Sequence, residues 1–152
     1  DHLLAACRIK PAVNQIESHP FFSQEDLVKE TVARGMYVQA YSPMAQGAAL
    51  ERPEIKAIAD KHGKSAAQVL LRWGLQVGNI ILPKSLTQWR IEANAELFDC
   101  ERDKDDMDVL NGLDEGMKMG KLGPVGTSAP GSRRSSSSGQ AASGNKLQMT
   151  SS

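Results

Sequence analysis

The chain has 152 residues, of which 40% are hydrophobic and 24% are charged, a mixture typical of globular proteins. The formal net charge is zero, but all 18 acidic residues lie at or before Glu115, whereas five of the 18 lysines and arginines follow it. Residues 1–115 therefore carry more acidic than basic side chains, which argues against a nucleic-acid partner, because phosphate backbones require concentrated Lys and Arg. No apolar run approaches the roughly 18 residues of a membrane span, so we expect no membrane contact.

The start of the chain and its cysteines carry two further expectations. The sequence begins at Asp1 without an initiator Met or a signal-peptide pattern, so we expect an internal start and hence a fragment. Cys7 and Cys100 form no CxxC motif, so we expect free thiols rather than a disulfide and a cytoplasmic, reducing location. The three histidines match no metal-ligand spacing, so we expect no metal site.

Strand-like and helix-like segments alternate along residues 1–115. Three short apolar segments, 12–16, 36–41 and 79–82, predict strands. Capping signals predict five helices. The first covers 24–34, begun by Ser23 with Asp26 and ended by Gly35, and the second runs from Pro53 to His62 before Gly63. The third is begun by Ser65 with Gln68, the fourth covers 88–95 and is capped by Thr87, and the fifth is capped by Asp103.

This order indicates a parallel α/β fold, in which helices cover the strands. In the middle strand Met36, Val38 and Ala40 alternate with Tyr37, Gln39 and Tyr41, so we expect two different faces. Three strands are too few to close a barrel, and an eight-unit barrel needs on the order of 200 residues or more. If the sequence belongs to a barrel, about half of that barrel is missing.

The composition changes at residue 116. Residues 116–152 contain no acidic or aromatic residue and are rich in Ser, Gly and Pro, so we predict a flexible, disordered tail. Within it, Arg133-Arg134-Ser135-Ser136 resembles a site for a basic-directed kinase, although serine tracts often produce such matches.

Polar residues gather where the three predicted strands end, which is where parallel α/β barrels place their chemistry: Asn14, Gln15 and Glu17, then Tyr41 and Ser42, then Lys84 and Ser85. Lys84, Ser85 and Arg90 flank the start of one helix, so we expect them to converge on an anion such as a phosphate, assisted by the helix dipole. The alternative is that they are ordinary solvated charges beside a helix start.

Other residues have a functional and a structural interpretation. Gln15 lies in a strand that we expect to be buried, so its amide needs a partner, either a ligand or the neighbouring backbone. Tyr41 either stacks on a planar ligand or packs half-buried. We expect no catalytic role for His19, because no Ser, Cys or Asp is placed to form a nucleophile pair with it. Trp73 belongs to the apolar face of its helix.

Four segments together resemble the C-terminal half of an aldo-keto reductase: VNQIESHP (13–20), QAYSPMAQG (39–47), AAQVLLRWGLQ (66–76) and ILPKSLTQWRIEAN (81–94). The resemblance covers about residues 1–115 and follows the order of the family. It implies the last three strands, with their helices, of a partial TIM (β/α)8 barrel that binds NADPH without a Rossmann domain. Residues 116–152 are a separate tail.

The resemblance also implies the cofactor-binding residues. Gln15 would hold the nicotinamide carboxamide, and Tyr41 would stack on the nicotinamide ring. The pyrophosphate would lie along Ser42, Met44 and Gln46. Lys84, Ser85 and Arg90 would grip the adenosine 2′-phosphate, and Asn94 would lie at the adenine. Ala93 stands where many members have a Glu that contacts the adenine, so this contact is absent here.

No catalytic residue is assigned. Members of the family use an Asp, a Tyr, a Lys and a His from earlier strands, and none of these positions falls within residues 1–152. The resemblance therefore implies an NADPH-dependent oxidoreductase of aldehydes or ketones whose N-terminal barrel half is missing here, and we expect this chain alone not to reduce carbonyls. The alternatives are a non-catalytic remnant, a nucleotide- or partner-binding subunit with the same partial fold, and an unrelated phosphate-binding α/β domain.

Overall fold

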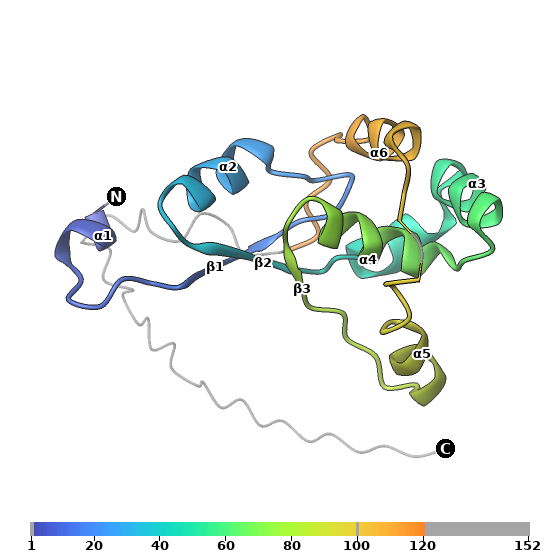
Figure 1. The fold of residues 1–152 in the computed structure, drawn as a ribbon, viewed down its shortest axis with the longest axis horizontal. Helices are drawn as coiled ribbons and strands as arrows, with labels where there is room; N and C mark the ends of the chain where they lie inside the picture. Colours follow the sequence, from blue (N-terminus) through green and yellow to red (C-terminus); the bar gives the residue numbers. More distant parts are fainter. Residues whose placement is uncertain (1, 100, 121–152) are drawn as a thin grey trace, which may run out of the picture. The chain divides into compact units, whose positions relative to one another are not determined.

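The computed structural model describes residues 2–99 and 101–120 (Figure 1). Three predictions lie outside the described residues: the state of Cys100, most of the predicted tail, and the kinase-like motif. The elements follow one another in this order: α1 (His2–Ala6), β1 (Val13–Glu17), α2 (Glu25–Ala33), β2 (Tyr37–Tyr41), the 3-10 helix η1 (Ala45–Glu51), α3 (Pro53–His62), α4 (Ala66–Gln76), β3 (Ile80–Ile81), α5 (Gln88–Ala93) and α6 (Lys104–Asn111).

The three strands form one parallel sheet in the order β1-β2-β3. The register pairs Glu17 with Tyr41 and Ala40 with Ile81, so the carboxyl ends of the strands meet at one edge. The predicted alternation along β2 is confirmed, because Val38 and Ala40 are 1% exposed whereas Tyr37 is 67% exposed. The fold is therefore α/β with a parallel sheet.

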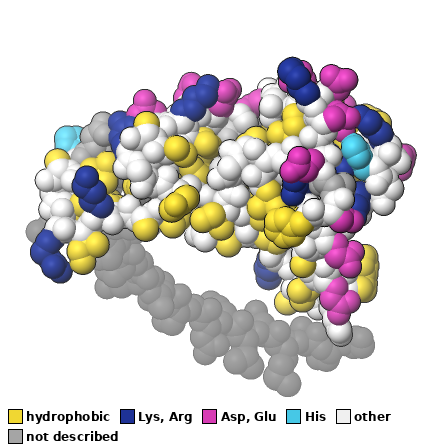
Figure 2. Space-filling model, in the orientation of Figure 1, with side chains coloured by type: hydrophobic (Ala, Val, Ile, Leu, Met, Phe, Trp, Pro, Cys, Tyr) yellow, Lys and Arg dark blue, Asp and Glu magenta, His cyan; other side chains and the backbone are white. Residues whose placement is uncertain are grey.

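The two faces of the sheet differ in their cover. Helix α2 contacts β2, and α4 contacts β3; α2 lies above β1 and β2 in the view of Figure 1. On the opposite face, Val13, Tyr37, Ile80 and Leu82 are between 37% and 67% exposed. Figure 2 shows hydrophobic side chains at the surface over the strands. Parallel sheets are normally covered on both faces, so the described residues leave one face without its usual cover.

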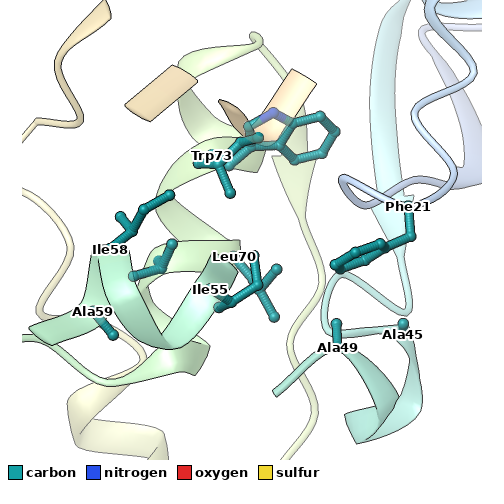
Figure 3. Close-up of a cluster of buried hydrophobic side chains, with 10 residues drawn as sticks. Phe21, Ala45, Ala49, Ile55, Ile58, Ala59, Leu70 and Trp73 are labelled. Carbon is teal, nitrogen blue, oxygen red and sulfur yellow. The ribbon is translucent and has the colours of Figure 1, made fainter. Parts of the chain in front are cut away.

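The main hydrophobic core lies among η1, α3, α4 and α6 (Figure 3). Phe21 enters it from the loop after β1, and Trp73 and Leu70 enter it from α4. The guanidinium of Arg52 lies 4.4 Å from the centroid of the Phe21 ring and covers it. This core packs the helices together beside the carboxyl edge of the sheet.

Predicted ends of three helices are confirmed. Helix α3 begins at Pro53 and is closed by Gly63 at a φ of 60°, a left-handed conformation that favours glycine. Ser65 and Gln68 form the predicted reciprocal capping box of α4. The side chain of Asp103 accepts a hydrogen bond from the backbone N–H of Asp106 and caps α6.

Two predicted capping side chains make no capping bond, although Thr87 does occupy the N-cap position of α5. Ser23 does not cap α2, because its hydroxyl and backbone N–H both donate to the carboxylate of Asp114, and Gln24 takes the N-cap position at a φ of 54°. The Thr87 side chain makes no capping bond. Instead, the hydroxyl of Ser85 accepts from the Thr87 N–H at 3.1 Å.

Contacts with the fold continue past the predicted boundary at residue 115. The N–H of Met117 donates to the carbonyl of Phe21 at 2.9 Å, and the N–H of Met119 donates to a Glu17 carboxylate oxygen at 2.6 Å. Both methionine side chains pack against the hydrophobic core. Residues 116–120, the part of the predicted tail that the structure describes, therefore return to the carboxyl edge of β1.

Gly74 provides a test of the packing between α4 and β3. A Cβ added at Gly74 would lie 2.7 Å from Ile81 Cγ2, a distance that forces a shift in a buried contact. We predict that Gly74→Ala lowers the free energy of unfolding by about 1–3 kcal/mol in a denaturant titration. In Gly112→Ala, the matched control, the nearest atoms lie 3.4 Å away, so a comparable loss there would contradict this account of the packing.

Candidate functional site

A cavity of about 890 Å³ opens beside the carboxyl ends of β2 and β3. Its walls come from the loop after β2, from η1, from α3, from the start of α4, from the loop after β3 and from α5. The volume is within the range of roughly 300–1,000 Å³ that is typical of cofactor sites. Segments far apart in the sequence therefore build one site large enough for a nucleotide.

The loop after β3 and α5 bring the predicted anion-binding residues to this cavity. Lys84, Ser85 and Arg90 all line it. Among the described residues, neither Lys84 nor Arg90 pairs with a carboxylate. The Arg90 guanidinium lies 5.0 Å from the centroid of the exposed Trp89 ring, a cation–π distance. Two cations and a hydroxyl without acidic partners fit a bound anion.

The α5 segment is held by polar contacts to its backbone. The side-chain amide of Gln68 donates to the carbonyls of Ala93 and Glu96 at 3.0 and 3.2 Å. Arg72 donates to the carbonyl of Leu97 at 3.0 Å. Helix α5 itself has no buried residue, so these bonds from α4 fix the segment that carries Arg90. The sequence predicted that Gln68 takes part in the cap of α4, but it did not predict that its side chain also binds the backbone of the α5 segment.

Unusual backbone conformations gather in the loop after β2. Ser42, Ala45 and Gln46 have positive φ angles of 50°, 47° and 53°, and Gly47 has a φ of 97°. Such a conformation costs roughly 1–2 kcal/mol for a residue other than glycine. Strained residues of this kind cluster at ligand-binding loops. In the sequence only Gly47 signals such a conformation, and the strain at Ser42, Ala45 and Gln46 was not predicted.

Most of the predicted cofactor-binding residues meet in this cavity. Its lining includes Ser42, Met44, Gln46, Lys84, Ser85, Arg90 and Asn94, together with Ala93. Gln15 and Tyr41 are not part of the lining and lie on β1 and β2.

The expected burial of Gln15 is wrong, because its face of the sheet is the uncovered one. The Gln15 amide does have a partner, since its Nε2 donates to Gln39 Oε1 at 2.7 Å. This bond goes to a side chain of the neighbouring strand and not to the backbone. The paired register of β1 and β2 places the two amides side by side.

Two titratable groups lie close to Glu17 at the end of β1. His19 is fully buried, with Nε2 3.3 Å from Glu17 Oε1, and burial lowers the pKa of its imidazole. For the Tyr41 hydroxyl, burial and then the neighbouring Glu17 carboxylate raise the pKa. Both rings therefore stay neutral near physiological pH. The predicted core position of Trp73 is confirmed, and its Nε1 donates to Asn111 at 2.8 Å.

A cluster of possible metal ligands lies between α3 and α6. Side-chain atoms of His62, Asp103 and Asp106 lie within 4.8 Å of one another. The Lys61 ammonium bonds both carboxylates, at 2.7 and 2.9 Å, and the His62 ring contacts Asp106 at 2.5 Å. The Lys61 ammonium thus already pairs with both carboxylates of this cluster, which we interpret as an ion-pair network joining the two helices.

Comparison with known proteins decides the family. The model of the aldo/keto reductase family matches residues 2–115. This chain belongs to the aldo/keto reductase family. Among the described residues, no helix is long and apolar enough to span a membrane.

Curated relatives from bacteria match the same region. An aldo-keto reductase of Mycobacterium sp. (strain KMS) is 42% identical over 118 residues, which are 78% of this chain and 43% of the relative. The glyoxal reductase of Bacillus subtilis (strain 168) is 42% identical over 120 residues, which are 79% of this chain and 44% of the relative. The chain therefore spans less than half the length of these aldo/keto reductases.

Solved structures agree with this assignment. The apo form of Gox0644 matches 77% of this chain and 44% of its own at a TM-score of 0.74 and 34% identity. A Gox0644 variant in complex with NADPH matches 80% of this chain and 44% of its own, at a TM-score of 0.73 and 35% identity. The aldose reductase of Schistosoma japonicum matches 75% of this chain and 38% of its own, at a TM-score of 0.70 and 43% identity.

The burial of His19 predicts a dependence of stability on pH. Because burial lowers the folded-state pKa below 6.5, the unfolded chain takes up a proton first on acidification, and folding stability falls as pH drops below that value. We predict that His19→Gln makes this loss shallower between about pH 7 and about pH 5, measured by denaturant unfolding. His2→Gln, at an exposed position, is the control. An unchanged slope in His19→Gln would contradict the prediction.

Proposed function

We propose that this chain is the C-terminal, cofactor-binding half of an NADPH-dependent aldo-keto reductase that converts aldehydes or ketones to alcohols. The observation that carries the proposal is that Lys84, Ser85 and Arg90 line a single cavity of nucleotide size without carboxylate partners among the described residues. The 2′-phosphate that distinguishes NADPH from NADH is a dianion near neutral pH and fits this set of donors. When bound, NADPH supplies the hydride.

The donors differ in what they do for such a phosphate. Arg90 offers a planar fork that binds two oxygens at once, and the flexible Lys84 adds a mobile positive charge. Ser85 already accepts a bond from Thr87, so its hydroxyl is held close to the loop backbone. Asn94, on the same cavity wall, is the proposed contact of the adenine.

The other end of the cofactor is assigned to the end of the sheet. In this proposal Tyr41 stacks on the nicotinamide and Gln15 holds its carboxamide, while the loop with Ser42, Met44 and Gln46 follows the pyrophosphate. The loop leads directly from Tyr41 into the cavity, so the chain itself connects the two ends. The likeness to the Gox0644 variant in complex with NADPH supports the same cofactor.

The uncovered sheet face supports the assignment to part of a barrel. In a closed (β/α)8 barrel, one face of every strand points into a packed interior. Here Val13, Tyr37 and Ile80 project from the face without cover, and β1 and β3 are both edge strands. We propose that an N-terminal half supplies the remaining strands, the catalytic residues and the carbonyl-binding pocket. The free thiol of Cys7 supports a cytoplasmic location.

The first test concerns cofactor selectivity. We predict that Arg90→Met weakens NADPH binding by tenfold or more, about 1.4 kcal/mol or above, and changes NADH binding little, because only NADPH carries the 2′-phosphate. Isothermal titration calorimetry on the purified chain measures both. The control is Lys104→Met, an exposed lysine of α6 paired with Asp108. Equal losses for the two cofactors would contradict the proposal.

The second test concerns catalysis. Because the proposed proton donor and its partners belong to earlier strands, we expect the purified chain to show no NADPH-dependent reduction of aldehydes or ketones. The consumption of NADPH in the presence of a panel of carbonyl compounds measures this. Turnover by the chain alone would show that its own residues carry out the reaction.

A further inference from the structure

One buried carboxylate joins four parts of the chain. Glu17, the last residue of β1, is 2% exposed. Its Oε1 accepts a hydrogen bond from the backbone N–H of Met119 at 2.6 Å, and its Oε2 accepts one from that of Gly120 at 2.8 Å. His19 Nε2 lies 3.3 Å from Oε1, and the Tyr41 hydroxyl lies beside the carboxylate, since a Cβ added at Gly120 would approach both groups. β1, the loop after it, β2 and the segment 116–120 thus meet at this group.

The charge of Glu17 is compensated by hydrogen bonds rather than by a cation. Among the described residues no lysine or arginine pairs with it, and burial keeps His19 neutral by lowering the imidazole pKa. A buried carboxylate is costly unless several donors point at it. Two backbone N–H groups and an imidazole do so here, and the Tyr41 phenol lies beside them. The two backbone donors are consequently held in place by charge-assisted bonds.

Glu17 and the segment 116–120 restrict the orientation of Tyr41. Glu17 and Tyr41 are direct neighbours in the β1–β2 register, and the carboxylate lies close enough to the phenol to raise its pKa. The segment 116–120 passes very close to this pair, since a Cβ added at Gly120 would lie 2.8 Å from Tyr41 Oη and 2.9 Å from Glu17 Oε2. Rotation of the ring would therefore move the hydroxyl away from the carboxylate or displace the segment.

We propose that Glu17 is the positioning residue of the nicotinamide end of the site. It orients the Tyr41 ring and anchors residues 119–120 beside it, so that the ring is preorganised for a planar ligand. This inference rests on the proposed function, in which Tyr41 stacks on the nicotinamide. Preorganisation of a binding group raises affinity without a direct contact to the ligand. Glu17 itself is not part of the cavity lining.

The test separates the two ends of the cofactor. Glu17→Gln keeps the size of the side chain but replaces one acceptor oxygen by a donor that faces other donors. We expect it to weaken NADPH binding about tenfold and to leave the binding of adenosine 2′,5′-bisphosphate within about twofold, because that probe lacks the nicotinamide. Calorimetry on the full 152-residue chain measures both. Glu25→Gln, an exposed acidic residue of α2 paired with Lys29, is the matched control.

Tyr41→Phe keeps the ring and removes only the hydroxyl, so it tests the same interaction if Glu17→Gln fails to fold. We expect a similar loss of NADPH affinity, and the double variant should bind no more weakly than either single variant, because both remove one interaction. Unchanged NADPH binding in Tyr41→Phe, or additive losses in the double variant, would overturn the inference.

The ionisation of Tyr41 provides a readout that a merely structural role would not change. The chain has two tyrosines, so in a Tyr37→Phe background the absorbance of the phenolate reports Tyr41 alone. Loss of the negative charge in Glu17→Gln is expected to shift this ionisation to lower pH. An unshifted titration would overturn the inference. Failure of the unmodified chain to bind adenosine 2′,5′-bisphosphate would instead refute the proposed function.

Discussion

The parallel pairing of β1, β2 and β3 is the constraint on which the rest of the structure depends. Parallel strands direct all their carboxyl ends to one edge, so the loops that leave Glu17, Tyr41 and Ile81 begin side by side. Residues separated by some 70 positions in the chain thereby contribute to one region. A slip of the register by one residue would turn Tyr41 to the other face and separate it from Glu17.

The two ends of the site are held by different kinds of interaction. At the sheet end, a buried carboxylate receives donors from several elements and leaves little freedom to Tyr41. At the phosphate end, α5 has no buried residue and depends on bonds from α4: Gln68 bonds the carbonyl of Ala93, and Arg72 bonds that of Leu97 just after the helix. The capping box of α4 is thus also a link between the hydrophobic core and the cationic wall of the cavity.

Local signals predicted the parts of the fold that depend on neighbours in the sequence. Pro53, Gly63 and the Ser65–Gln68 pair mark helix ends because their chemistry acts within one turn. Long-range contacts set the rest. Ser23 resembled a cap, but it bonds Asp114, a residue 91 positions away. The helices α1 and η1 were not predicted, and the strained residues of the loop after β2 carry no signal other than Gly47.

The sequence predicted which residues belong to the candidate site, but it did not predict how they are arranged in space. The spacing of Lys84, Ser85 and Arg90 indicated an anion site, and the structure places all three on one cavity. Gln15 was expected to be buried because it lies in a strand of an α/β sheet, but it occupies the face that the described residues leave uncovered. The role of Glu17 could not be read from spacing, because two of its donors are backbone groups of Met119 and Gly120.

The most direct test of the central claim is a nuclear magnetic resonance titration of the isotope-labelled chain with adenosine 2′-monophosphate. The account predicts that the largest shifts of amide resonances fall on Lys84, Ser85 and Arg90, and that adenosine without a phosphate does not reproduce them. Shifts of equal size with adenosine alone, or shifts confined to other lysines and arginines, would contradict a phosphate site at the end of β3.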